Sequence, residues 1–168
     1  GVEVAGNWQA AVRISDLLFS TWYGAFATWV LPRLSGPPEK RPGWGTIALC
    51  PLGALTIGCG LSLFGPLVLD LSYVGRFPEA LAVMRVQCMA EFVRACGYPL
   101  GLMLIARRSA QAFSVLEVAG VVLQLGLVRI LVPRLGPVGA PASIVVESAI
   151  YFVAAAWFLR RGKGSVKA

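Results

Sequence analysis

The sequence predicts an all-α fold, a polytopic bundle of about five transmembrane helices that forms a single domain over residues 1–168. Composition supports this fold class, because 57% of the residues are apolar and 14% are charged, whereas globular proteins average about 25% charged residues. The mean hydropathy is +0.74. The apolar residues also form long blocks between Gly- and Pro-rich segments, without the period of a soluble amphipathic core. These features are typical of a protein solvated by lipid.

Five apolar blocks are long enough to cross a bilayer, which takes about 20 predominantly apolar residues. Gly, Pro and charged residues interrupt them in the segments SGPPEKRPGWG, YVGRFPE, ARRS and VPRLGPVG, and such residues mark turns and loops. Pro66 and Pro99 lie inside blocks, so we expect kinks there. The predicted spans are residues 8–32, 45–69, 79–106, 110–132 and 137–159.

The distribution of Lys and Arg predicts the orientation of these spans. Nine basic residues lie beside alternate span ends on one side of the membrane, and two lie on the other side. Because basic residues mark the cytoplasmic side, we expect an odd number of spans, an outer N-terminus and a cytoplasmic C-terminus. The nine are Arg33, Lys40, Arg41, Arg107, Arg108, Arg160, Arg161, Lys163 and Lys167, and the two are Arg76 and Arg134.

Eight charged residues remain at or near membrane depth. Each costs about 2.5–3.5 kcal/mol at the centre of a helix, so a simple anchor would not carry them. Glu117 and Glu147 have no basic neighbour at helical spacing, which favours a role in a polar pathway, whereas Arg85 and Arg129 are close enough to the outer face to reach the interface. The eight are Arg13, Asp16, Arg85, Glu91, Arg94, Glu117, Arg129 and Glu147.

Two oppositely charged pairs are spaced three residues apart, Arg13 with Asp16 and Glu91 with Arg94. This spacing allows pairing along one helix. The pairs therefore either neutralise each other and stabilise the helix bundle, or take part in the function of the protein. Both interpretations stay open.

Helical spacing gathers these charges on narrow polar stripes that are rich in small residues. We expect the stripes to face other helices or a watery cavity, and the bulky side of each helix to face lipid. In the first span the stripe is Gln9, Arg13, Asp16, Ser20, Gly24 and Ala27, opposite Trp22, Phe26 and Trp29. In the third it is Gln87, Glu91, Arg94, Tyr98 and Gly101, in the fourth Glu117, Gly120 and Gln124, and in the fifth Ser143, Glu147, Tyr151 and Ala154.

Several function classes lack support in this sequence. It has no histidine and no Cys/His ligand spacing, so we expect no metal and no cofactor. It has no nucleotide-binding or hydrolase motif, so we expect no enzyme activity. Its positive charge lies at the ends of apolar blocks, where topology signals belong, so we expect no nucleic-acid partner.

The run GNWQAAVRISDLLFSTWYGAFATWVLPRLS resembles a helix in polysaccharide (O-antigen, Wzx-type) flippases, members of the multidrug/oligosaccharidyl-lipid/polysaccharide exporter superfamily. The shared elements are Gly6, Trp8-Gln9, Arg13-Ile14-Ser15 and Leu31–Ser35. The stretches LFGPLVLDLSYVGRFPEA and RLGPVGAPASIVVES are also similar to that family. The resemblance implies half of a two-lobed, twelve-helix transporter in the bacterial inner membrane, with this chain as a fragment covering about helices eight to twelve. The N-terminal lobe would be its missing partner.

The function implied by the resemblance is flipping of an isoprenoid-pyrophosphate-linked oligosaccharide between membrane leaflets during polysaccharide biosynthesis. A pyrophosphate needs basic partners, so Arg13, Arg94 and Arg85 are candidates for binding it. Asp16 is a further substrate-binding candidate, because a carboxylate beside them would offset their charge or bind sugar hydroxyls. Candidates for ion coupling or the substrate pathway are Glu91, Glu117 and Glu147.

Two alternatives stay open. If the chain is a cation-coupled multidrug exporter, we expect a net acidic cavity. If it is a membrane assembly subunit without transport, we expect every polar stripe to be a protein–protein interface.

Overall fold

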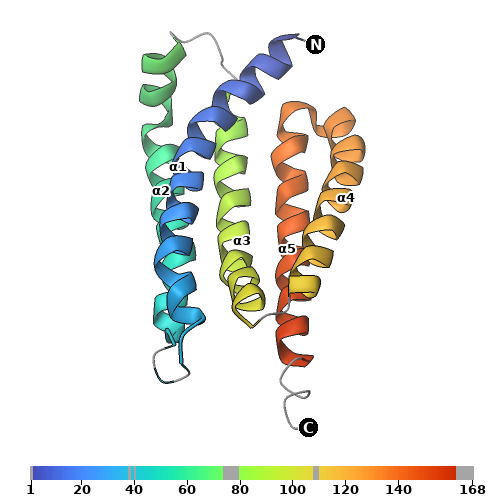
Figure 1. Ribbon diagram of the computed structural model, residues 1–168. Coiled ribbons are helices and arrows are strands. Elements are labelled where there is room, and N and C mark those ends of the chain that lie inside the picture. Colours follow the sequence, from blue (N-terminus) through green and yellow to red (C-terminus); the bar gives the residue numbers. More distant parts are fainter. Residues whose placement is uncertain (1, 38, 40, 74–79, 108–109, 162–168) are drawn as a thin grey trace.

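The computed structural model describes residues 2–37, 39, 41–73, 80–107 and 110–161. In this part of the chain the secondary structure is helical, without strands, which confirms the predicted all-α fold class. Five α-helices run alongside one another (Figure 1). They are α1 (Val2–Leu34), α2 (Trp44–Tyr73), α3 (Ala80–Ala106), α4 (Ala110–Leu135) and α5 (Gly139–Arg161), with the 3-10 turn η2 (Gly136–Val138) before α5.

Three helical stretches are long and apolar enough to cross a membrane, as expected of a membrane protein. They are Trp44–Leu71, Ala80–Ala106 and Gln111–Arg161. The third contains α4 and α5, which lie antiparallel to each other (Figure 1). Helix α1 is not among them, because Asp16 and several Ser and Thr residues lower its hydropathy. Its 33 residues extend about 50 Å, and the span at residues 8–32 stays a prediction.

Some residues used to predict the orientation lie outside the described part of the chain. They are Lys40, Arg76, Arg108, Lys163 and Lys167, together with residues 74–79 of the predicted turn.

The hairpin between α4 and α5 is built by glycine and proline. Gly136 has φ of 60°, a left-handed conformation that glycine adopts at low cost. Pro137 follows within η2, where its fixed φ suits a helix start. Gly139 lies so close to Leu131 that a Cβ there would be 2.6 Å from the Leu131 carbonyl oxygen. The chain therefore reverses within a few residues, as its Gly and Pro content predicts.

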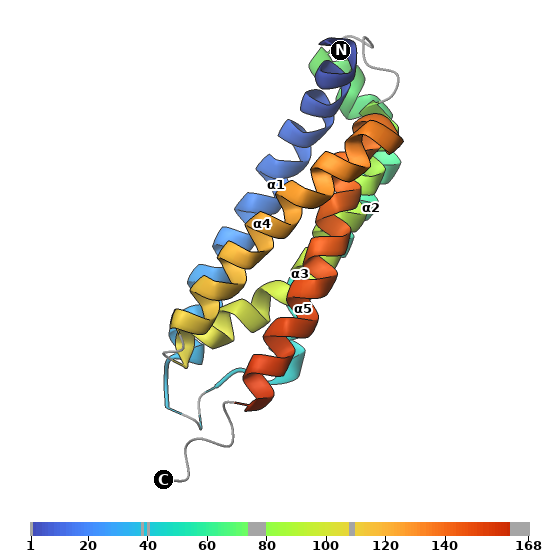
Figure 2. The same cartoon turned by 90° about the vertical axis from the view of Figure 1, so that its right-hand side faces the viewer.

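Helix α3 is central, since it packs against α1, α2 and α5, while α4 packs mainly against α5. The larger apolar core lies between α1, α2 and α3, and a smaller one joins α3 to α4 and α5. Figure 2 shows α3 changing direction in its C-terminal part (lime to yellow). Pro99 lies inside α3, and a proline removes a helical hydrogen bond and bends the helix.

Large apolar side chains cover the outward faces of the bundle. Leu63 and Leu71 of α2 are 75% and 77% exposed, and Val122 of α4 and Val153 of α5 are 66% and 67% exposed. A soluble protein rarely exposes contiguous apolar surface of this kind. In a bilayer the same side chains would contact lipid acyl chains. Their exposure is therefore consistent with the membrane-length apolar helices that carry them.

Candidate functional site: a polar cavity beside a buried carboxylate

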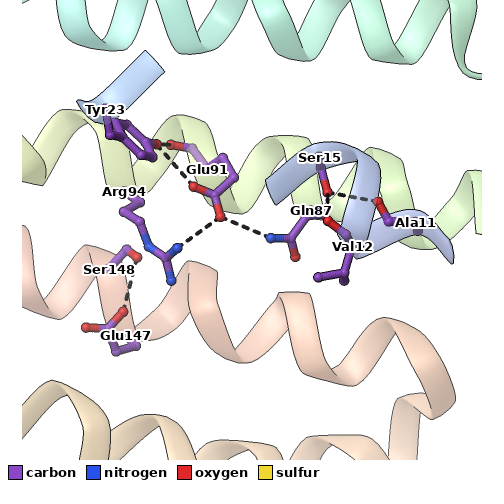
Figure 3. Close-up of polar contacts among 9 residues, drawn as sticks. All are labelled: Ala11, Val12, Ser15, Tyr23, Gln87, Glu91, Arg94, Glu147 and Ser148. Atoms are coloured by element: carbon purple, nitrogen blue, oxygen red, sulfur yellow. Dashed lines mark hydrogen bonds and ion pairs between the residues drawn. The ribbon is translucent and has the colours of Figure 1, made fainter. Parts of the chain in front are cut away.

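A carboxylate on α3 is enclosed by hydrogen-bond donors from two helices. The Glu91 side chain is only 2% exposed, and its Oε1 atom lies 3.0 Å from Nη1 of Arg94 in an ion pair. The Gln87 side chain donates to the same Oε1 atom at 3.0 Å. Figure 3 shows Gln87, Arg94 and Tyr23 converging on Glu91. The expected pairing of Glu91 with Arg94 is confirmed, and a buried carboxylate with these partners recovers part of its desolvation cost.

Tyr23 connects this carboxylate to α1. Its hydroxyl lies 2.7 Å from the backbone oxygen of Glu91 and 3.2 Å from Oε2, so it can donate to either. Its ring packs on Tyr98 with centroids 4.9 Å apart, and the Tyr98 hydroxyl donates to the Tyr23 carbonyl at 3.4 Å. Tyr23 was not among the predicted site residues, although it follows Asp16 by seven residues, about two helical turns, and so lies beside the predicted polar stripe of α1.

On the other side of Arg94, a cavity of about 390 Å³ lies between α3, α4 and α5. Its polar lining comes from all three helices. Arg94 is 39% exposed, and in Figure 3 its side chain extends from α3 toward Glu147 and Ser148 of α5. The charged and polar lining residues are Arg94, Tyr98, Glu117, Gln124, Glu147, Ser148 and Tyr151.

Two glycines leave room for the polar groups in this cavity. A Cβ at Gly120 of α4 would lie 2.8 Å from Oε1 of Glu147, and a Cβ at Gly101 of α3 would lie 2.6 Å from the Tyr151 hydroxyl. Helical spacing had placed Gly101 and Gly120 on the polar stripes. Their small size lets the carboxylate and the phenol lie against neighbouring helices, which leaves the cavity open.

The seven candidate residues separate into two groups. Arg94, Glu117 and Glu147 line the cavity, and Glu91 is buried directly behind Arg94. Arg13 and Asp16 of α1 and Arg85 of α3 are exposed and do not line it. Arg85 precedes Arg94 by nine residues, about two and a half helical turns, so the two side chains leave α3 on opposite sides.

The polar stripe of α1 does not face inward as expected. Arg13, Asp16, Ser20 and Gly24 are exposed, whereas Phe26 is buried at 3% exposure. The aromatic side of α1 instead packs on its neighbours: the Trp22 ring lies against Gly53 of α2 and its indole N–H donates to the Cys50 carbonyl at 3.0 Å. Aromatic side chains bury more apolar area than the small residues of the stripe, which explains this orientation. Only Trp29, 41% exposed, behaves as predicted.

Arg13 and Asp16 also do not form an ion pair with each other; the described residues contain one ion pair, between Glu91 and Arg94. Asp16 instead lies near Arg94 of α3, so these opposite charges on two helices attract each other.

The charge of the cavity is acidic. Two carboxylates, from Glu117 and Glu147, line it together with one guanidinium, from Arg94, and that guanidinium is already paired with Glu91. Tyr151 lines the same cavity as these two carboxylates. The expected arginine-rich cavity is therefore not formed within the described residues, because Arg13 and Arg85 lie on other faces of the bundle.

Comparisons with protein-family models, with curated proteins and with solved structures find no match to this chain. The resemblance to polysaccharide flippases therefore stays a prediction. The proposal about function therefore depends on this chain's own all-α bundle, apolar membrane-length helices and polar cavity.

Proposed function

We propose that this chain is part of a membrane transporter that translocates a lipid-linked oligosaccharide, and that the cavity between α3, α4 and α5 belongs to the substrate pathway. The observation that carries the proposal is the cavity lining, which brings Arg94, Glu117 and Glu147 together from three helices. Ionisable groups within membrane-length helices are expensive and usually serve transport or ligand binding. A structural anchor would gain nothing from a polar cavity.

The chemistry of the lining suits a saccharide. Carboxylates and the Gln124 amide accept and donate hydrogen bonds to sugar hydroxyls, and the rings of Tyr98 and Tyr151 offer apolar surface to the faces of sugar rings. A volume of about 390 Å³ is within the roughly 300–1,000 Å³ of small-molecule sites. The cavity is therefore large enough for part of an oligosaccharide.

Fewer arginines are placed to bind a phosphate than the sequence predicted. Arg94 is the one arginine of the cavity, so it is the candidate for contacting a pyrophosphate there. Arg13 lies on the exposed stripe of α1 and would reach a substrate only if another part of the transporter covered that stripe. The missing N-terminal lobe is the partner that we propose for this surface.

A cation-coupled exporter is the second candidate, and the excess of two carboxylates over one arginine in the cavity favours it. In such a transporter Glu117 and Glu147 would bind the coupling proton or cation. The two candidates share the cavity and differ in the cargo.

The charge distribution supports an inner-membrane location with the predicted orientation. Five arginines lie beside helix ends at one end of the bundle, while Arg134 lies at the opposite end (Figure 1). The five are Arg33, Arg41, Arg107, Arg160 and Arg161. Basic residues concentrate on the cytoplasmic side. We propose that the end with five arginines faces the cytoplasm of a bacterium.

The test is complementation of a bacterial strain that cannot export its lipid-linked glycan, with the full-length reading frame that contains this chain. We expect surface glycan to be restored by the natural protein and lost with Glu117→Gln, Glu147→Gln and Arg94→Gln at normal protein levels. Glu39→Gln, in the exposed connection between α1 and α2, is the matched control. Normal export with all three cavity variants would contradict the pathway; drug efflux without glycan export would favour the second candidate.

A further inference from the structure

A second cavity, of about 610 Å³, lies at the end of the bundle where α1, α3 and α5 end and α2 begins. Its lining contains three arginines, Arg41, Arg107 and Arg160, and no carboxylate. The remaining lining is largely apolar and includes Leu100 and Phe152. This combination of a cationic rim and an apolar interior is absent from the first cavity, whose charged lining is mostly acidic.

The three guanidinium groups lack an acidic partner in the described part of the chain, where the ion pair is that of Glu91 and Arg94. Arg107 is held in place, because its Nη1 atom donates to the Leu159 carbonyl of α5 at 3.3 Å. Helix α2 begins at Trp44, so the positive end of its dipole also lies at this cavity. Like charges gathered around one space repel each other, and an anion between them would lower that energy.

The position of the cavity identifies the type of anion. It lies at the end of membrane-length helices, where a bilayer places its headgroups. Trp44, 74% exposed, lies beside it, and tryptophan concentrates at this level of the membrane. The cavity therefore offers guanidinium groups at headgroup level and an apolar surface directed into the hydrocarbon.

We propose that this cavity is a binding site for an anionic phospholipid of the surrounding bilayer. The phosphate lies among Arg41, Arg107 and Arg160, and an acyl chain lies along Leu100 and Phe152. Arginine is suited to phosphate because its planar donors bind two oxygens at once, and basic pockets between membrane helices bind anionic headgroups. The site does not depend on the transport function proposed above.

The test is native mass spectrometry of the detergent-solubilised chain, titrated with phosphatidylglycerol and, separately, with phosphatidylcholine of the same acyl chains. We expect saturable binding of one phosphatidylglycerol and at least tenfold weaker binding of phosphatidylcholine. The double variant Arg41→Gln/Arg160→Gln should bind phosphatidylglycerol about tenfold more weakly or worse, because each charge-assisted hydrogen bond contributes about that factor. Arg107 stays unchanged in this variant, since it also holds α5.

The matched control is Arg129→Gln/Arg134→Gln, which removes the same charge from exposed positions of α4 outside the cavity. Its binding of phosphatidylglycerol should be unchanged. Equal weakening by both double variants would overturn the proposal, because it would reduce the effect to overall charge. Displacement of the lipid by equimolar inorganic phosphate would also overturn it, in favour of a site for soluble phosphate. If the first double variant does not fold, by circular dichroism, the single variant Arg41→Gln in the loop decides the same question.

Discussion

The two sides of α3 hold carboxylates under opposite conditions. Toward α1, Glu91 is buried and receives donors from Gln87, Arg94 and the Tyr23 hydroxyl. Toward α4 and α5, Glu147 lies in the cavity, and its one hydrogen-bond partner within the described residues is the adjacent Ser148 hydroxyl, at 3.2 Å. Glu91 thus receives three donors from its own protein, whereas Glu147 keeps more acceptor capacity for a ligand. A charged residue at membrane depth therefore identifies a binding site only when its hydrogen-bond and ion-pair partners are known.

The helices on each side of α3 differ in the same way. Between α1, α2 and α3 lies the larger apolar core, and the core that joins α3 to α4 and α5 is smaller. In the most apolar 18-residue window of α3, 56% of the residues are buried, whereas in the most apolar 18-residue window between Gln111 and Arg161 the share is 6%. The first side therefore supplies stability, while the second is loosely enclosed and has space for a ligand.

The largest effect on stability is expected from Glu91→Leu. The change removes the acceptor of Gln87 and of Arg94, and each donor left without a partner costs about 1–3 kcal/mol. We expect the free energy of unfolding in detergent to fall by about that amount for the buried Gln87, and by less for the partly exposed Arg94. Denaturant unfolding followed by tryptophan fluorescence measures it. A stability unchanged or raised would show that the network around Glu91 is no more favourable than an apolar core.

Tyr23→Phe tests the link between α1 and the buried carboxylate. It removes only the hydroxyl, and keeps the ring that packs on Tyr98. We expect a loss of about 1 kcal/mol in the free energy of unfolding, the usual contribution of one hydrogen bond, measured in the same unfolding assay. Thr28→Val, an exposed hydroxyl change on the same helix, is the control and should have a smaller effect.

Gly120→Ala is expected to separate stability from function. Alanine favours a helix over glycine by about 1 kcal/mol, so unfolding should become no easier. The new Cβ would lie 2.8 Å from Oε1 of Glu147 and push that carboxylate from its position. Export in the complementation assay should therefore fall at normal protein levels. Gly126→Ala on the same helix has open space around its Cβ position and should leave export unchanged.

The smallest effect on stability is expected from Glu147→Leu. This carboxylate has no partner on another helix in the described part of the chain, and changes at such positions usually stay within about 0.5 kcal/mol. The same unfolding assay should show this variant close to the natural chain. A loss as large as that of Glu91→Leu would remove the distinction between the two sides of α3.

Much of the fold could be predicted from the sequence. Apolar blocks, with Gly and Pro between them, predicted five membrane spans, and a helix lies at each of the five places. That all five cross a membrane stays a prediction. The spacing of Gln87, Glu91 and Arg94 predicted a shared face, and these three side chains do form one network. Local periodicity was sufficient for these features because they depend on neighbours within one helix.

The division of the polar residues between helices could not be predicted. Periodicity placed Arg13 and Asp16 on one face of α1 but could not tell whether that face or the aromatic face meets α3. Packing between helices decides this, and it buries Phe19 and Phe26 in the core shared with α2 and α3. The second cavity could not be predicted from local periodicity either, because its arginines come from a loop and from the ends of two helices far apart in sequence.

The most direct test of this account is the water accessibility of the two sides of α3 in a bilayer. In a variant whose four cysteines are replaced by serine or alanine, Glu147→Cys, Glu91→Cys and Val153→Cys would each be treated in membrane vesicles with a water-soluble thiol reagent. We predict fast labelling at position 147, in the cavity, and little at position 91, which is buried, or at position 153, which is on the outward apolar face of α5. No labelling at position 147, or labelling equal to that at position 153, would contradict a hydrated polar cavity.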